Sequence, residues 1–336
     1  MMKNIWQWQE PGAQRNPWLI GAGVTLAVLL VIVLVLAFWW SRAPKPFWVA
    51  SDVSGQRAPI GYSTTQTLIE VIEILLDKPG GYLANDIAPP GIFLDNIPSW
   101  EFGVVVQVRD LARALRNDYS RSQSQSTEDL DLARAEPVLN YAHNSWILPS
   151  TERQYRKGIH YLKAYRDRLS DPENRDAQFY ARADNLREWL AVVEKRLGSL
   201  SQRLSASVGQ VRVNTDLAGE RAAANTDILP DYVSVKTPWL KIDNVFFEAR
   251  GTTWALVHFL RAAQFDFEKV LKDKNAIVSL RQIIRELEGG LRPINSPVIM
   301  NGSGYGVFAN HSLVLASYLS RANSAVINLR ELLDQG

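Results

Sequence analysis

A run of apolar positions near the start of the chain is its strongest hydropathy pattern. Residues 18–40 form 23 consecutive positions without a charged side chain. A helix of this length spans about 34 Å, enough to cross a hydrocarbon core of about 30 Å. Indole rings prefer the headgroup level of a bilayer. The pattern therefore predicts a transmembrane helix over residues 18–40, with Trp18, Trp39, Trp40 and Arg42 at the membrane interfaces.

A cleaved signal peptide is the alternative interpretation of this run. Such a peptide has an apolar core of about 7 to 15 residues and small residues at its cleavage site. Here the run is longer, and bulky Phe38, Trp39 and Trp40 occupy the place of the small residues. The sequence favours a retained anchor.

The charges that flank the run leave its orientation open. Lys3 and Arg15 precede it, and Arg42 and Lys45 follow it, so the positive-inside rule is tied. Long domains translocate largely regardless of their charge, and 296 residues follow the run. We therefore expect residues 1–17 to form a cytoplasmic tail and the rest to form a periplasmic head, anchored in a bacterial inner membrane.

Beyond the run, helical periodicity alternates with short breaks rich in Pro and Gly. Residues 41–61 contain three prolines and two glycines and are expected to form a semi-extended stalk. Residues 62–336 predict an all-α bundle of about eight helices, either as one unit or as two packed halves, 62–207 and 239–336. A short extended piece is expected near residues 232–236.

Two predicted helices carry apolar residues at alternating spacings of four and three, which is a heptad pattern. The first, over residues 173–206, has Phe179, Ala183, Leu186, Leu190, Val193, Leu197, Leu200 and Leu204. The second, at the end of the chain, has Leu315, Leu319, Ala322, Val326, Leu329 and Leu333. Both seams are expected to pack inside one bundle, with an intermolecular coiled coil as the alternative.

The charge balance excludes some classes of partner. Residues 41–336 carry 35 basic and 34 acidic side chains, whereas dedicated nucleic-acid binding usually shows a strong basic excess. No nucleic-acid partner is expected. The absence of cysteine fits both an oxidising compartment and the cytosol.

No metal or cofactor site is expected from the ligand pattern. The chain has no cysteine thiolates, and its histidines are scattered at His143, His160, His258 and His311. Zinc sites need clustered ligands. His258 lies in an apolar helix segment and is expected to be a hydrogen-bonded core residue.

Two carboxylates stand in aromatic surroundings and are the outside candidates for catalysis. Glycosidase chemistry needs two carboxyl groups at a defined separation, and Glu101 and Glu248 are the acidic residues with such neighbours. Nothing in the sequence pairs them. Structural roles are favoured: a charge in the first turn of a helix for Glu101 and an ion pair for Glu248. No catalytic residue is assigned.

Three arginines share one face of a predicted helix, Arg109, Arg113 and Arg116. They could contact anionic lipid headgroups or the carboxylates of a partner. A solvated helix surface is the favoured interpretation.

A glycine-rich segment precedes the last helix, with Gly302, Gly304 and Gly306. A helix N-terminus attracts anions, so these glycines could hold a phosphate or carboxylate. The segment matches no nucleotide-binding motif, and a tight structural turn is favoured. Residues 146–155 could likewise form a partner-docking loop, although a hydrophobic staple onto the next helix explains them more simply.

Four phrases of the chain are similar to one known family. VFFEARGTTWALVHFLRA, SLRQIIRELE, NGSGYGVFANHSLVLASYLSRANSAVINLRELL and PSTERQYRKG resemble an uncharacterised proteobacterial family known only as a domain of unknown function. The resemblance implies an inner-membrane protein with a periplasmic helical head. It implies no reaction, ligand or catalytic residue.

The sequence as a whole favours a binding role. We expect a membrane-anchored envelope protein whose helical head binds other proteins or envelope components, with the lipid bilayer held through residues 18–40. The alternative is a periplasmic enzyme that acts on cell-wall glycan or lipid. An enzyme predicts a deep pocket with two convergent titratable groups, and a binding protein predicts an exposed apolar or aromatic patch. The sequence does not fix an oligomeric state.

Overall fold

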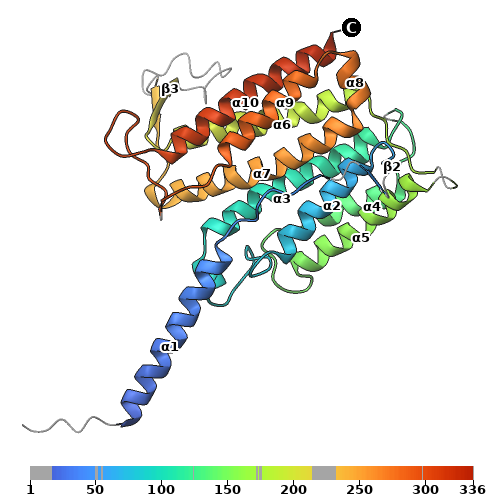
Figure 1. The fold of residues 1–336 in the computed structure, drawn as a ribbon. Coiled ribbons are helices and arrows are strands. Elements are labelled where there is room, and N and C mark those ends of the chain that lie inside the picture. Colours follow the sequence, from blue (N-terminus) through green and yellow to red (C-terminus); the bar gives the residue numbers. More distant parts are fainter. Residues whose placement is uncertain are drawn as a thin grey trace, which may run out of the picture.

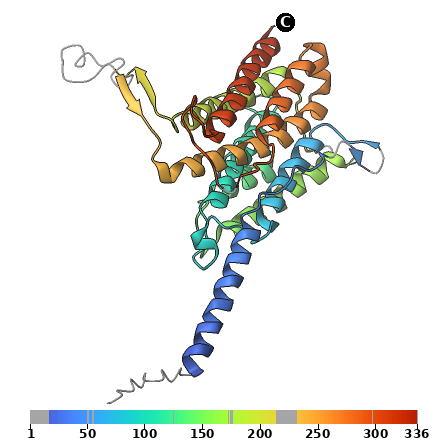
Figure 2. The same ribbon diagram turned by 60° about the vertical axis from the view of Figure 1, so that its left-hand side comes forward.

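The computed structural model describes residues 17–49, 52–53, 56–123, 125–171, 173, 176–213, 232–296 and 298–335. A long helix, α1, projects from a head built almost entirely of helices, as Figures 1 and 2 show from two sides. The α-helices are α1 Pro17–Trp40, α2 Tyr62–Asp77, α3 Asn96–Ala114, α4 Leu130–Leu139, α5 Thr151–Ser170, α6 Ala183–Ser205, α7 Ile242–Asp266, α8 Glu268–Asp273, α9 Ile277–Gly290 and α10 His311–Asp334. The predicted all-α fold is confirmed.

Shorter elements connect these helices. Two antiparallel hairpins pair β1 with β2 and β3 with β4. The extended piece expected near residues 232–236 is strand β4. The bounds are β1 Asp52–Val53, β2 Gln56–Arg57, β3 Gln210–Val213, β4 Tyr232–Val235, the 3-10 turns η1 Gly91–Phe93 and η4 Trp239–Lys241, and a π-helical turn η2 Leu115–Tyr119 that continues α3.

Helix α1 covers the apolar run that the sequence marks. Among the described residues it is the one helix long and apolar enough to cross a membrane by length and composition, a test that a signal sequence also passes. None of its most apolar window is buried against the head. The residues of the predicted tail before Pro17 lie outside the described part of the chain.

The helices of the head form three layers. Figure 1 shows α3 and α7 in the middle, α2, α4 and α5 on one side, and α6, α9 and α10 on the other. Contacts join α3 with α7, α4 with α5, and α10 with both α6 and α9. One continuous cluster of buried apolar side chains runs through all three layers. The two predicted halves therefore share a core, because α6 of the first packs on α10 of the second.

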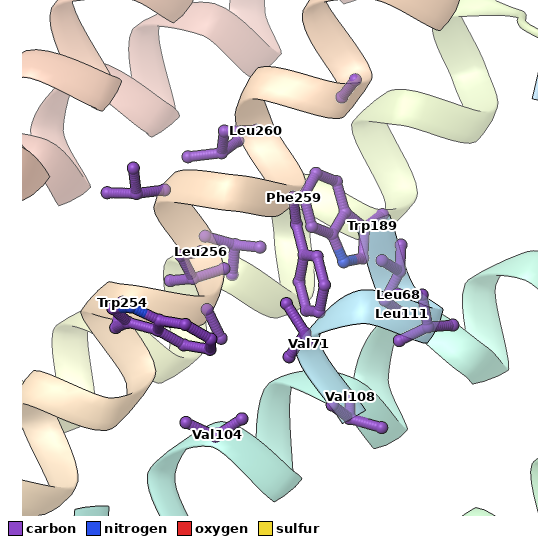
Figure 3. Packing of buried hydrophobic residues seen from close by; sticks show 14 of the residues in the cluster. Leu68, Val71, Val104, Val108, Leu111, Trp189, Trp254, Leu256, Phe259 and Leu260 are labelled. Carbon is purple, nitrogen blue, oxygen red and sulfur yellow. The ribbon is translucent and has the colours of Figure 1, made fainter. Parts of the chain in front are cut away.

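The middle layer is held together by a close crossing of α3 and α7. A Cβ on Gly103 would lie 2.1 Å from the Glu248 carbonyl oxygen, and one on Gly251 would lie 2.0 Å from that of Trp100. Only glycine allows the two backbones to approach this closely. The rings of Trp100 and Trp254 pack beside this contact, with centroids 5.2 Å apart. Figure 3 shows the adjoining core, where α7 residues meet α2, α3 and α6.

The two heptad seams pack against each other, as expected. Buried residues of α6 from Leu186 to Leu204 face buried residues of α10 from Leu315 to Leu333. The predicted start of the first helix at residue 173 is wrong, because α6 begins at Ala183. Residues 176–182 are not helical, and the backbone N–H of Tyr180 donates instead to the carbonyl of Tyr119.

The segment that follows α1 lies along the head. The Trp40 ring covers Gly80, where a Cβ would come within 2.6 Å of it. Further on, the Phe47 ring stacks on His258 with centroids 4.0 Å apart, and the Phe47 backbone N–H donates to His258 Nε2 at 3.0 Å. These contacts fix the direction in which the described part of the predicted stalk leaves α1.

The head has two ends that are used below. The α1 end is where α1 joins, and it holds the α2–α3 loop, residues 78–95, and the α4–α5 loop, residues 140–150. The far end holds the start of α2 and the end of α10. There the Asp266 carboxylate at the end of α7 accepts hydrogen bonds from the backbone N–H groups of Gly61 and Thr64. Helix α2 is therefore capped by a residue of another helix.

Candidate functional site

Exposed apolar side chains gather in two groups at the α1 end. Clustered apolar surface of this kind marks contact sites with other molecules. The first group, which we term the loop tips, belongs to the two loops beside α1 and consists of Ile87, Ile92, Phe93, Trp146, Ile147 and Leu148. The second, which we term the groove rim, lies around η4 and the segment before α10 and consists of Trp239, Leu240, Val298, Tyr305, Val307 and Phe308.

A groove of about 590 Å³ adjoins the groove rim. Its walls come from η4, the start of α7 and residues 294–296 and 298–301, and Ala43, just after α1, also lines it. The Arg250 guanidinium borders the groove and donates to the carbonyls of Gly290, Leu291 and Arg292 at the end of α9. Cations suit the carbonyl end of a helix, so Arg250 ties α7 to α9 and fixes one wall of the groove.

Hydrogen bonds hold the two loops of the first group to each other. The Tyr82 hydroxyl donates to the His143 carbonyl at 2.8 Å. The Asn85 amide donates to the Ser145 carbonyl at 2.8 Å and to the Glu152 carboxylate at 3.0 Å. The loop tips therefore stand on a cross-braced base.

A buried ion pair lies beneath these loops. Lys78 Nζ is 2.6 Å from Glu101 Oε1, and their side chains are 1% and 0% exposed. The carboxylate also accepts hydrogen bonds from the backbone N–H groups of Leu83 and Ala84. Burial raises the pKa of Glu101, and Lys78 opposes that shift. The expected role of Glu101 as a first-turn charge is wrong, because α3 begins at Asn96; the residue fixes the α2–α3 loop instead.

Glu248 makes the ion pair that the sequence favours. Both of its carboxylate oxygens accept hydrogen bonds from Arg203, at 2.7 and 2.6 Å. Its partner lies on α6, whereas Glu101 is bound by Lys78 at the end of α2. The structure thus gives the two candidate carboxylates separate cationic partners and does not bring them together as a reacting pair.

The three arginines of the predicted face have three different environments. Arg109 is half-buried and donates to the carbonyls of Leu139 and Tyr141 at the end of α4, so a solvated position is wrong for it. Arg116 is held by the carboxylates of Glu128 and Glu136. Arg113 alone of the three is exposed, with a long contact of 3.9 Å to Glu136. They do not form a shared anion-binding surface.

The glycine-rich segment is a closed turn, as favoured. Asn301 and Asn310 form a β-bridge across it. The Gly302 N–H donates to the Ala309 carbonyl, and the Gly306 N–H donates to the Ser303 carbonyl. The side chain of Asn310 caps α10 by accepting from the Leu313 N–H at 2.8 Å. The N–H groups of Gly302, Gly306 and Leu313 are therefore already bonded within the chain and are not free to bind an anion. Gly304 lies in the same turn, near Leu313.

The histidines lie apart, and His258 is a core residue. It is fully buried; its Nδ1 is 2.6 Å from the Trp254 carbonyl, and its Nε2 accepts from Phe47. Both bonds are made by the neutral ring with the proton on Nδ1. Burial lowers the pKa of His258 to about 4. In the described residues no three His, Asp or Glu side chains gather as metal ligands would.

Sequence reasoning found part of this surface. It considered Trp146 as part of a docking loop, and the structure leaves Trp146 and Leu148 53% and 82% exposed. It missed the other loop, with Ile87 and Phe93, and the whole groove rim. The available signal was the presence of large apolar residues within non-periodic segments rich in Pro and Gly.

Comparisons with known proteins identify a family for almost the whole chain. The family model described as an uncharacterized protein conserved in bacteria (DUF2333) matches residues 13–336, which confirms the resemblance to an uncharacterised bacterial family. No curated protein matches the chain, and no solved structure matches it.

Proposed function

Because the chain belongs to the DUF2333 family of bacterial proteins, we propose that it is a single-pass inner-membrane protein whose helical head binds other envelope proteins or components. In this proposal residues 1–17 lie in the cytoplasm and residues 62–336 in the periplasm. The head acts by binding and catalyses no reaction. Anchoring raises the effective concentration of the head for partners near the bilayer without any added contact.

The junction between α1 and the head supports a retained anchor. Trp40 packs against Gly80, so the last turn of α1 is part of the folded structure. Cleavage after α1 would expose the apolar surface that Trp40 covers. The Arg42 guanidinium lies 4.8 Å from the Phe38 ring centroid, and an arginine beside an aromatic ring suits the headgroup level.

The groove rim is the single observation that carries the binding role. Trp239, Leu240 and Tyr305 have exposed fractions of 81%, 75% and 107%, and aromatic anchors of this kind dominate protein interfaces. The groove beside them begins next to Ala43, so an occupant would be another molecule held close to the bilayer. The carboxylates of the alternative enzyme, Glu101 and Glu248, are each bound by a separate cation, and we therefore favour binding.

Site-specific crosslinking in intact cells tests the proposal. A photoreactive amino acid replaces Trp239 or Tyr305 in one set of variants and Val278, an exposed apolar residue of the far end, in the control. We expect a discrete adduct with one envelope protein from the two groove-rim positions and none from Val278. Groove-rim positions that give no adduct, or the same adducts as Val278, would remove the proposed binding site.

A reporter fusion tests the orientation separately. Alkaline phosphatase is active in the periplasm and inactive in the cytosol, so a fusion after residue 336 should be active. A cytosolic reporter that works at the same position would contradict the periplasmic head.

A further inference from the structure

The loop tips lie where a membrane crossed by α1 would be. Trp40, at the end of the predicted span, packs on Gly80 at the start of the α2–α3 loop. This loop is bonded to the α4–α5 loop through Tyr82 and Asn85. Figure 1 shows both loops, teal and green, beside the junction of α1 with the head. Residues that follow within these loops are therefore next to the headgroup level.

The side chains at these tips have the chemistry of a bilayer contact. Phe93 and Leu148 are 72% and 82% exposed, and Trp146 is 53% exposed. Tryptophan prefers the headgroup region, and aliphatic and phenyl groups prefer the acyl boundary just below it. Exposure of these side chains to water is unfavourable, and transfer of their apolar surface into a membrane removes that free-energy cost.

The base beneath the tips is rigid enough to hold them at one depth. Glu101 binds the backbone of Leu83 and Ala84, and the Thr151 hydroxyl donates to the Ala142 carbonyl and accepts from the Ser145 N–H. These bonds tie each loop to the adjacent helix end. The tips are thus presented as a fixed surface rather than as free chain.

Basic residues surround the tips. Arg42 and Lys45 follow α1, and Arg153, Arg156 and Lys157 are exposed on the first turns of α5; Arg156 is paired with Asp77. Cations in this position attract anionic headgroups. Acidic groups on the same side include Asp77, Asp86, Asp95 and Glu152, of which Asp77 pairs with Arg156 and Glu152 accepts from Asn85.

We propose that the loop tips enter the outer boundary of the same bilayer that α1 crosses, so that the head has a second lipid contact beside its anchor. The inference rests on the proposed single-pass topology. It concerns a surface separate from the groove rim. A second lipid contact would fix the tilt of the head and the height of the groove above the membrane.

Probes placed in the full chain can measure this contact directly. The chain has no cysteine, so Phe93→Cys, Leu148→Cys and the far-end control Val278→Cys each take a single environment-sensitive NBD label. Val278, at 75% exposed, matches the exposure of the two tips. Each protein is reconstituted in phosphatidylcholine–phosphatidylglycerol vesicles. Quenching is read from headgroup-level nitroxide lipids and from aqueous iodide.

We expect lipid nitroxides to quench the probes at residues 93 and 148, and iodide to quench them several-fold less than at residue 278. Quenching by iodide equal to that at residue 278, without nitroxide quenching, would overturn the inference. Protection from iodide without nitroxide quenching would also overturn it, because the tips would then be covered by protein. Nitroxide quenching at residue 278 would show that the signal is not specific to the tips.

Two further readouts separate the inference from the proposed function. If the chain is extracted from vesicles by alkaline carbonate, α1 is not an anchor and both proposals fail; if it is retained while the tips stay in water, only the inference fails. Removing phosphatidylglycerol, or combining Arg153→Gln with Lys157→Gln, should weaken nitroxide quenching at residue 148. Unchanged quenching in both cases would exclude a contribution from the basic residues.

Discussion

At the far end of the head, arginine–carboxylate pairs hold the loops, whereas at the α1 end the loop tips are apolar and an ion pair is buried beneath them. Arg168, which is 22% exposed, binds Asp129 and Asp131 at 2.7 and 2.8 Å, and these carboxylates are 8% and 19% exposed. By contrast, the Lys78–Glu101 pair is excluded from water. The far end has the charge arrangement of a water-exposed surface. The loop tips at the α1 end have an apolar exterior over a buried polar base, which suits a surface that contacts lipid or protein.

The largest expected effect comes from breaking the buried pair. Lys78→Ala leaves the Glu101 carboxylate fully buried without its cation, and loss of one partner of a buried pair costs about 3 to 5 kcal/mol. The free energy of unfolding should fall by this amount in urea titrations of the full chain in detergent, followed by circular dichroism.

The partly exposed pair between Arg203 and Glu248, which are 44% and 16% exposed, is the matched control. Arg203 is 44% exposed, so Arg203→Ala should cost about 1 kcal/mol or less. The double variant Lys78→Met with Glu101→Gln removes both charges and should recover much of the loss. Equal costs for Lys78→Ala and Arg203→Ala would mean that water reaches the pair at the α1 end.

The contrast between these pairs also explains what the sequence could not predict. The seams of α6 and α10 were predictable because heptad spacing is local and both seams pack within one bundle. The partner of Glu101 was not predictable, because Lys78 lies next to Glu101 only when the chain turns at Gly80 and Gly81. Arg109 was misplaced for the same reason: the carbonyls that it binds belong to α4, and periodicity within α3 contains no information about them.

The hydrogen bond between His258 and Phe47, in the segment that follows α1, should break in acid. The pKa of His258 is about 4 in the folded chain, below its usual value of about 6.5. Protonation of His258 therefore favours the unfolded state. Above about pH 6.5 the ring is neutral in both states and does not change the free energy of unfolding. We expect about 3 kcal/mol of stability to be lost as the pH falls from about 6.5 to about 4, because a protonated Nε2 cannot accept from Phe47.

Other titrating groups make a comparison of variants necessary. Burial raises the pKa of Glu101 and of Asp266. Protonation of these two carboxylates therefore stabilises the folded state, whereas protonation of His258 destabilises it. The cation of Arg261 also lowers the pKa of His258. The test is the difference between the natural chain and His258→Gln in urea unfolding at each pH. A constant difference between pH 6.5 and 4 would contradict the assigned tautomer.

Loss of a far-end pair should have a smaller effect that depends on salt. Arg168→Met removes the contacts with Asp129, Asp131 and Asp176, and a partly exposed network of this kind contributes about 1 kcal/mol. The cost should shrink as ionic strength rises, because salt screens the charges in the natural chain. Arg113→Met, which removes one contact of 3.9 Å, should have almost no effect. A cost for Arg168→Met that does not change with salt would point to lost packing instead.

Substitutions at the loop tips should have the smallest effect on the free energy of unfolding, unlike substitutions in the core. Phe93→Ser with Leu148→Ser changes two exposed side chains, and surface substitutions usually stay within about 0.5 kcal/mol. In detergent, urea unfolding should therefore match that of the natural chain. In vesicles the double variant should lower the protection of a probe at residue 92 from aqueous iodide, because the apolar area available to the bilayer is smaller. A large loss of stability in detergent would mean that the tips pack within the head, and the contrast between the two ends would then lose its basis.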